Sequence, residues 1–141
     1  MNKMRILGID YGDSRCGIAV TDDLGITAQG VETIHYKGND KILLSRLDEL
    51  ISKYNVSILV VGMPFNMDGS KTKRAEVTEK FIHKLRCKYN KIKIETVDER
   101  LTTMQANVTM NELNIDKKKK KELVDTISAV YILESYMNKK T

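Results

Sequence analysis

Three acidic residues stand where a folded chain would bury or focus their charge. Asp10 ends an apolar run of strand type, Glu99 follows a later run, and Asp125 lies on the face of a helical segment. A carboxylate in such a place is costly to desolvate unless it is paired or binds a cation. Carboxylates that converge from separate elements repel one another, which predicts a cation between them. Oxygen donors without a metal-binding His or Cys favour Mg²⁺ or Mn²⁺ over Zn²⁺.

Each acid also has a simpler explanation. Asp10 is compatible with a turn aspartate at a strand end, and Asp125 with a satisfied ion pair on a helix. Glu99 is compatible with a loop acid that pairs with Arg100, and Asp98 is equally suited to be the ligand by composition. The prediction of a site therefore depends on whether three separate elements bring their acids together.

The elements that must position these acids follow from hydrophobic periodicity and turn residues. In chain order we expect strands over 5–11, 16–21 and 26–34, a helix over 41–54, a strand over 57–63, a helix over 72–89 and a strand over 92–97. The remaining elements are a short helix from about 103 to 112, a loop-like, flexible stretch over 113–121, and a last helix over about 118–137.

This order predicts an α/β fold with a five-stranded mixed sheet, three antiparallel strands then two parallel ones, and helices on both faces. The carboxyl ends of parallel strands meet at one edge, which is the common ligand site of open α/β sheets. That edge would carry Asp10 and Glu99. The chain has no repeat and no linker, and it has one proline, so we expect residues 1–141 to form one domain.

Composition restricts the class of protein. Hydrophobic residues make up 41% and charged residues 30%, which is typical of a soluble globular protein. No apolar run approaches the roughly 20 residues that a bilayer requires. The N-terminus has no apolar signal segment, so we expect a cytoplasmic location and no membrane partner. Two cysteines, Cys16 and Cys87, cannot form a disulfide framework or a four-ligand zinc site.

The net charge of +5 is unevenly distributed. Residues 71–121 hold 15 Lys/Arg and 7 Asp/Glu, a net of +8, so the rest of the chain carries −3. A basic segment of this kind favours a polyanion such as nucleic acid, although a solvated lysine-rich surface has the same composition. Beside a carboxylate site it fits two-metal phosphodiester chemistry. The candidate phosphate-binding residues are Asn66, Lys71, Lys73, Arg74, Arg100, Lys117, Lys118, Lys119, Lys120 and Lys121.

Five segments together resemble a known family. They are GIDYG (8–12), SRCGIAVTD (14–22), VVGMPFNMDGS (60–70), DERLTT (98–103) and DTISAVYILESY (125–136). In order and spacing the chain resembles the YqgF/RuvX family, proposed pre-16S ribosomal RNA nucleases related to Holliday-junction resolvases. The resemblance implies an RNase H-like fold and an Asp–Glu–Asp metal site at Asp10, Glu99 and Asp125, and it selects Glu99 over Asp98.

The resemblance further implies a metal-dependent nuclease that acts in 5′-end processing of precursor 16S ribosomal RNA, with Mg²⁺ or Mn²⁺ in a two-metal site. A Holliday-junction resolvase acting on branched DNA is the alternative, and a symmetric junction would then favour a homodimer over a monomer. A non-catalytic RNA-binding module is a third possibility. An actin-like phosphotransferase would need two lobes of this fold, and a chain of 141 residues supplies one.

Overall fold

The computed structural model describes residues 5–64, 68–98 and 117–139. The first elements are β1 (Arg5–Tyr11), β2 (Arg15–Thr21), β3 (Ala28–His35) and α1 (Asp40–Tyr54). The later elements are β4 (Val56–Met63), α2 (Lys73–Lys88), β5 (Lys93–Asp98) and α4 (Lys117–Lys139). These elements confirm the expected order. The short helix expected over 103–112 lies outside the described residues.

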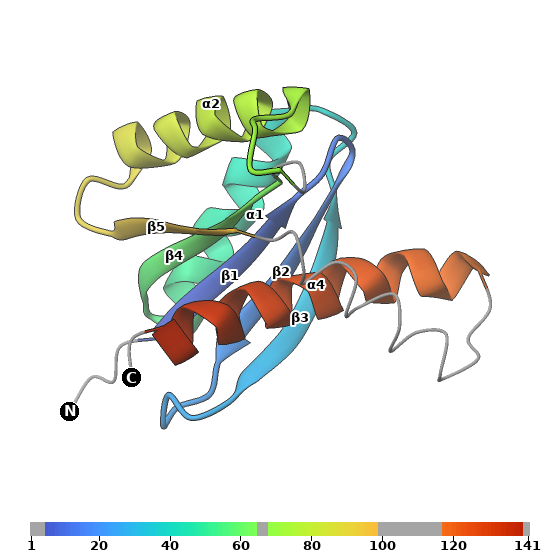
Figure 1. Cartoon of the computed structure of the whole chain (residues 1–141). Coiled ribbons are helices and arrows are strands. Elements are labelled where there is room, and N and C mark those ends of the chain that lie inside the picture. The colour runs from blue at the N-terminus through green and yellow to red at the C-terminus, as the bar shows by residue number, and fades with distance from the viewer. Residues whose placement is uncertain (1–4, 65–67, 99–116, 140–141) are drawn as a thin grey trace.

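The strands form one sheet in the order β3-β2-β1-β4-β5 (Figure 1). β1 pairs antiparallel with β2, and β2 pairs antiparallel with β3. β1 and β4 are parallel, as are β4 and β5. The five-stranded mixed sheet is therefore confirmed, with β1 at its centre. The carboxyl ends of β1, β4 and β5 lie at the same edge of the sheet.

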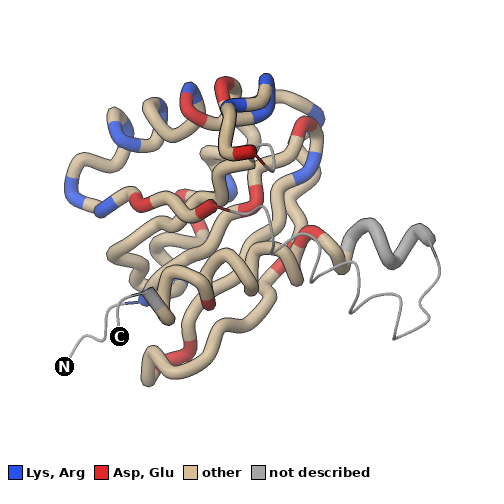
Figure 2. Tube along the Cα trace, viewed as in Figure 1, with Lys and Arg blue, Asp and Glu red and all other residues tan. Residues whose placement is uncertain are grey.

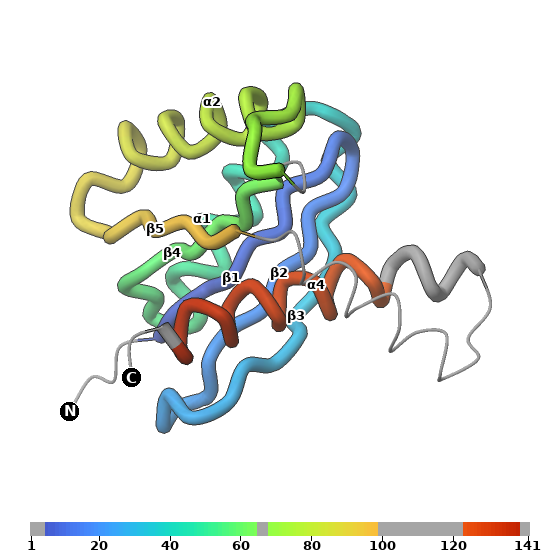
Figure 3. Tube along the Cα trace, viewed as in Figure 1, coloured from blue at the N-terminus to red at the C-terminus, as the bar shows by residue number. Residues whose placement is uncertain are grey.

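Alternation along the strands divides the core into two layers. Leu7 and Ile9 of β1 belong to a large cluster packed against α1 and α2. Ala19 of β2 and Val60 of β4 belong to a smaller cluster packed against α4. Figure 3 shows α4 crossing β1, β2 and β3 at an angle, and α4 contacts all three strands. Helices thus cover both faces, as the sequence predicted.

β4 is buried on both sides, which explains its unbroken apolar run. Leu59 and Val61 face the cluster under α1 and α2, and Val60 faces α4. A hydrogen bond joins the start of α2 to the residue that follows β4. The Thr72 side chain accepts a hydrogen bond from the Ala75 amide at 2.9 Å, and its hydroxyl donates to the Pro64 carbonyl at 2.6 Å. This cap fixes the start of α2 at the carboxyl edge of the sheet.

The five lysines of residues 117–121 begin a helix. α4 starts at Lys117, so the last helix expected from about residue 118 is confirmed, and the loop-like stretch expected over 113–121 is wrong for residues 117–121. Lysine has good intrinsic helix propensity, but a run of lysines has no apolar periodicity that would reveal a helix.

Within the part of the chain that the structure describes, no helix is long and apolar enough to cross a membrane.

Candidate active site at the carboxyl edge of the sheet

Asp10 lies near the end of the central strand, on the face that α4 covers. Asp10 is directly opposite Gly17 in the β1–β2 ladder, and residues directly opposite in an antiparallel pair share a face. A Cβ atom on Gly17 would meet Asp125 of α4, so Asp10 also faces α4. On the other side, the parallel β1–β4 register ends with Ile9 opposite Val61, one residue before Asp10 and Gly62. The Asp10 side chain is half-buried at this place.

Glycines on β1 and β2 let α4 lie directly on the sheet. A Cβ atom on Gly8 would be 2.8 Å from the Ala129 carbonyl oxygen, which is too close for a real contact. On Gly17 it would overlap the Asp125 carbonyl group and lie 3.0 Å from the Asp125 Cβ atom. Asp125 therefore lies against Gly17, the cross-strand neighbour of Asp10. The fold thus brings two of the three predicted acids to one place.

Arg15, which sequence reasoning did not select, is part of this place. Its Nε atom lies 3.2 Å from Oδ2 of Asp125. The ion pair is partly buried, with exposed side-chain fractions of 34% for Arg15 and 17% for Asp125. Arg15 is two residues from Gly17 on β2, so alternation puts it on the α4 face. The ion pair that the sequence left open for Asp125 is present, and it lies inside the candidate site.

The negative charges of both acids affect the pKa of the Cys16 thiol. Cys16 is fully buried on the opposite face of β2, and burial raises the pKa of its thiol well above the usual value. The negative charges of Asp10 and then Asp125 raise this pKa further. Both carboxylates therefore act on the beginning of β2. A thiol with a raised pKa stays protonated at neutral pH, so Cys16 is a core residue rather than a nucleophile.

The turn between β1 and β2 is held from two sides. The buried Tyr36 hydroxyl donates to the Gly12 carbonyl oxygen, and burial raises the pKa of Tyr36, which keeps that proton in place. The Arg74 guanidinium donates to the Tyr11 carbonyl and to the Asp13 carboxylate, both at 2.5 Å. Arg74 was selected from the sequence as a phosphate contact, and here it ties α2 to the turn that follows Asp10.

The end of β5 shows on which face of the sheet Asp98 lies. Ile94 lies in the cluster under α1 and α2, whereas Val97 lies in the cluster under α4. Asp98 has the parity of Ile94, so its exposed side chain is on the face opposite Asp10. Glu99 and Arg100 lie outside the described residues.

The described basic residues have acidic partners at several positions. Lys71 pairs with Glu79 at 2.8 Å, and the hydrogen bond with that carboxylate raises the pKa of Lys71. Figure 2 shows acidic residues interspersed among the basic residues of α2. Further ion pairs from this part of the chain are Arg74–Asp13, Lys84–Asp40, Lys88–Asp48 and Lys93–Glu95. The basic character of residues 71–98 is therefore partly neutralised within the fold.

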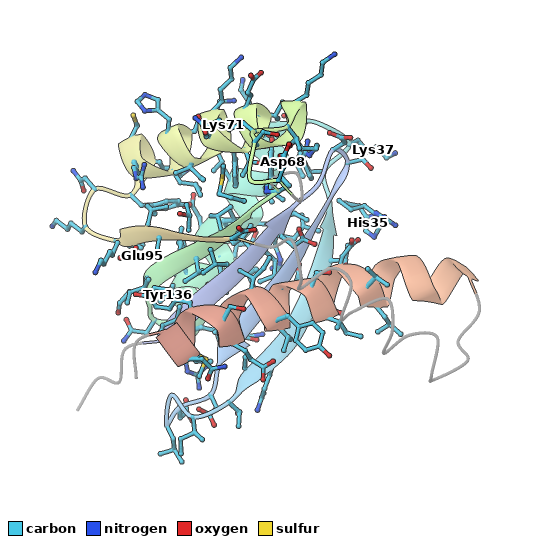
Figure 4. The ribbon with its side chains drawn as sticks, viewed as in Figure 1. His35, Lys37, Asp68, Lys71, Glu95 and Tyr136 are labelled. Atoms are coloured by element: carbon cyan, nitrogen blue, oxygen red, sulfur yellow. The ribbon has the colours of Figure 1, made fainter. Side chains whose placement is uncertain are left out.

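The loop before α2 has part of the expected geometry. Gly69 has a φ of 90°, a left-handed conformation that favours glycine. Asp68 accepts hydrogen bonds from the Ser70 amide at 2.8 Å and the Ser70 hydroxyl at 2.7 Å. Figure 4 shows Asp68 and Lys71 near one another at the start of α2. Lys73 is exposed there, whereas Asn66 and the side chains of residues 117–121 lie outside the description.

The donor set fits a hard divalent cation. Asp10 and Asp125 would offer carboxylate oxygens from two elements that pack closely on each other. Among the described residues no three His, Cys, Asp or Glu side chains gather closely enough to hold a metal ion. The third proposed ligand, Glu99, is not among them. The described half of the site is thus a pair of carboxylates with an arginine beside it.

Ser128 provides a test of how closely α4 must pack. Its side chain is 1% exposed, and its Oγ has no hydrogen-bond partner among the residues that the structure describes. A buried hydroxyl without a partner costs free energy, so Ser128→Ala should raise the free energy of unfolding by about 1 kcal/mol in urea denaturation. A loss of more than 1 kcal/mol would show that the hydroxyl has a partner.

The matched variant Ser128→Leu adds volume between α4 and the sheet. We expect it to separate Asp125 from Asp10 and to weaken Mg²⁺ binding while the chain stays folded. Unchanged Mg²⁺ affinity in a folded Ser128→Leu protein would contradict the importance of this close packing.

A mixed sheet with strand order β3-β2-β1-β4-β5 and a helix across it is the RNase H-like arrangement. The chain is similar in structure to Thermus thermophilus RuvC in complex with a Holliday junction substrate, with a TM-score of 0.55. That comparison has 12% sequence identity and covers 97% of this chain and 96% of RuvC. It supports the fold. Residues 4–139 match the family model described as "RuvX: Holliday junction resolvase", and the chain belongs to this family.

Curated relatives cover the chain almost from end to end. A protein of Acetivibrio thermocellus named "Putative pre-16S rRNA nuclease" is 50% identical over 137 residues, covering 97% of both chains. A protein of Ruminiclostridium cellulolyticum with the same name is 52% identical over 136 residues, covering 96% of this chain and 95% of the relative. The family resemblance seen in the sequence is confirmed.

Proposed function

We propose that the chain is a metal-dependent nuclease that hydrolyses phosphodiester bonds in the 5′-end processing of precursor 16S ribosomal RNA, in the cytoplasm. The observation that carries the proposal is that Asp10 and Asp125 are both neighbours of Gly17, on the face of the sheet that α4 covers. Asp10 is directly opposite Gly17 in the β1–β2 ladder, and Asp125 of α4 lies against it. The names of the relatives support ribosomal RNA as the substrate. Nucleic acid is the partner that this function requires.

The proposed ligands are Asp10, Glu99 and Asp125. Two Mg²⁺ or Mn²⁺ ions bound there would activate a water molecule and stabilise the leaving oxygen. The chain itself contributes positioning. The glycines under α4 fix Asp125 relative to Asp10, and Tyr36 and Arg74 hold the turn that follows Asp10. A rigid arrangement of this kind keeps the carboxylates in place before substrate binds.

Glu99, rather than Asp98, is proposed as the third ligand. Asp98 lies on the strand face away from Asp10, and neighbouring residues of a strand alternate between faces. Glu99→Gln should abolish Mg²⁺-dependent cleavage, whereas Asp98→Asn should leave kcat within about twofold of wild type. The measurement is a steady-state cleavage assay of both variants. The reverse pattern would show that Asp98 is the ligand.

The proposed phosphate contacts are Asn66, Lys71, Lys73, Arg74, Arg100 and the five lysines Lys117–Lys121. Phosphate contacts release counterions, so the slope of log affinity against log salt should be about −0.7 for each contact with single-stranded RNA. Replacing the five lysines by serine should flatten this slope and raise KM, with kcat nearly unchanged. A control with Lys41 and Lys53 of α1 replaced by serine should keep the wild-type slope. If the five-serine variant keeps it too, the lysines are only a solvated surface.

A resolvase acting on branched DNA is the second candidate, favoured by the description of the matching family model. The proposed function is tested by incubating the protein with precursor 16S ribosomal RNA and a four-way DNA junction side by side, with Mg²⁺ or with EDTA. Mg²⁺-dependent cleavage of the RNA supports the first function. Cleavage of the junction alone, by a homodimer in sedimentation analysis, supports the second. Binding without cleavage of either substrate would favour a non-catalytic module.

A further inference from the structure

Arg15 forms an ion pair with one of the acids of the candidate site. It begins β2 on the face that α4 covers, and its guanidinium contacts the Asp125 carboxylate with an Nε–Oδ2 distance of 3.2 Å. Gly17, two residues further along β2, is directly opposite Asp10. Arg15 is therefore the diagonal cross-strand neighbour of Asp10, within reach of a long side chain. Arg15 thus contacts Asp125 and lies on the same face of the sheet as Asp10.

When no metal ion is bound, the two acids need another positive charge nearby. Asp125 is only 17% exposed, and Asp10 is half-buried beside the glycine on which Asp125 rests. Like charges in such a place repel one another more strongly than in water. The guanidinium of arginine stays protonated at any physiological pH and its planar donors fit a carboxylate. Arg15 can therefore hold Asp125 against the sheet in the absence of a cation.

We infer that Arg15 is a built-in counter-ion of the metal site, which stabilises the cation-free state and competes with the cation for Asp125. The inference rests on the proposed function, because it concerns the same carboxylates. Binding of a divalent cation beside Asp125 would place two positive charges on one carboxylate, so cation binding weakens the ion pair. Arg15 thereby lowers the affinity of the site for metal and keeps Asp125 in place when the site is empty.

A purely structural ion pair predicts something different. An arginine that only fastens α4 to β2 would lower stability when it is removed, but would leave the metal affinity unchanged or weaken it, because the site would loosen. Removing a competing counter-ion changes the stability and the metal affinity in opposite directions. Its removal lowers the melting temperature without metal and raises the affinity for metal, and added metal then restores more stability than in wild type.

The experiment measures Mn²⁺ binding to the full chain by electron paramagnetic resonance of the free ion, and thermal unfolding with and without Mn²⁺. Arg15→Gln removes the charge and retains a polar side chain, whereas Arg15→Lys retains the charge. We expect Arg15→Gln to bind Mn²⁺ about tenfold more tightly than wild type, to melt a few degrees lower without metal, and to gain more from Mn²⁺. Arg15→Lys should bind Mn²⁺ with an affinity within about threefold of wild type.

A matched control distinguishes the general effect of losing an ion pair from the specific effect of losing the Arg15–Asp125 pair. Arg46 of α1 pairs with Glu32 at 2.5 Å and with Glu49 at 2.6 Å, on the opposite face of the sheet. Arg46→Gln should lower the melting temperature and leave the Mn²⁺ affinity unchanged. Unchanged or weaker Mn²⁺ binding by Arg15→Gln, beside measurable binding by wild type, would contradict the role of Arg15 alone. Absence of Mn²⁺ binding in both proteins would contradict the proposed metal site itself.

Discussion

Asp10→Asn should lower kcat/KM for Mg²⁺-dependent cleavage at least about a thousandfold. A metal ion supplies several kcal/mol of transition-state stabilisation, and each 1.36 kcal/mol corresponds to a tenfold change in rate. The substitution keeps the shape of the side chain and removes the charge that would hold the cation. Asp10 lies on the sheet face that Asp125 of α4 packs against. Removing one of two neighbouring negative charges reduces their repulsion, so the melting temperature should not fall.

The control for this variant is Asp48→Asn. Asp48 lies on α1, where it accepts a hydrogen bond from the Tyr89 hydroxyl and pairs with Lys88 at 3.1 Å, on the opposite face of the sheet. It should retain wild-type cleavage at saturating Mg²⁺. Cleavage by Asp10→Asn at a rate near that of wild type, on either substrate, would place the catalytic centre elsewhere in the chain.

Gly17→Ala should have the largest effect on the fold and should also abolish cleavage. Its Cβ atom would overlap the Asp125 carbonyl group, which belongs to the backbone of α4 and cannot rotate away. The helix must then move off the sheet, and we expect the free energy of unfolding to fall by about 3 kcal/mol in urea denaturation. The same movement should separate Asp125 from Asp10 and weaken Mn²⁺ binding.

Gly30→Ala is the matched control, because Gly30 lies under the same helix on β3. There a Cβ atom would lie 3.3 Å from the Thr126 Cβ atom, a tight contact with a side chain that small shifts can relieve. We expect a change below about 1 kcal/mol and unchanged Mn²⁺ binding. Equal losses in both variants would show that the contact between Gly17 and Asp125 has no special importance for the site.

The strands and helices were predictable because their signals are local. The strand over 5–11 has the predicted bounds, and β4 was recognisable from an apolar run that only burial on both faces explains. The placement of Asp10 at a strand end and of Asp125 on a helix face followed from the same periodicities. These local patterns were enough to predict the mixed sheet with helices on both faces, whereas the RNase H-like arrangement was implied by the family resemblance.

The contacts between elements were not predictable in the same way. The pairing of Arg15 with Asp125 depends on the register of β2 and on the angle at which α4 crosses it. Arg74 was selected as a phosphate contact because it belongs to the basic segment over 71–121, yet its partners are Tyr11 at the end of β1 and Asp13 in the following turn. A single sequence contains no direct signal for such long-range pairs.

The most direct test of the proposed metal site is a crystal structure of the protein with Mn²⁺, in which anomalous scattering locates the metal. We expect a peak about 2.0–2.3 Å from carboxylate oxygens of both Asp10 and Asp125, since Mg²⁺ is held at about 2.0–2.1 Å and Mn²⁺ is slightly larger. A second ion would lie roughly 3.5–4 Å from the first. Mn²⁺ bound at other residues, or carboxylates of Asp10 and Asp125 more than about 8 Å apart, too far to share ions at that spacing, would contradict it.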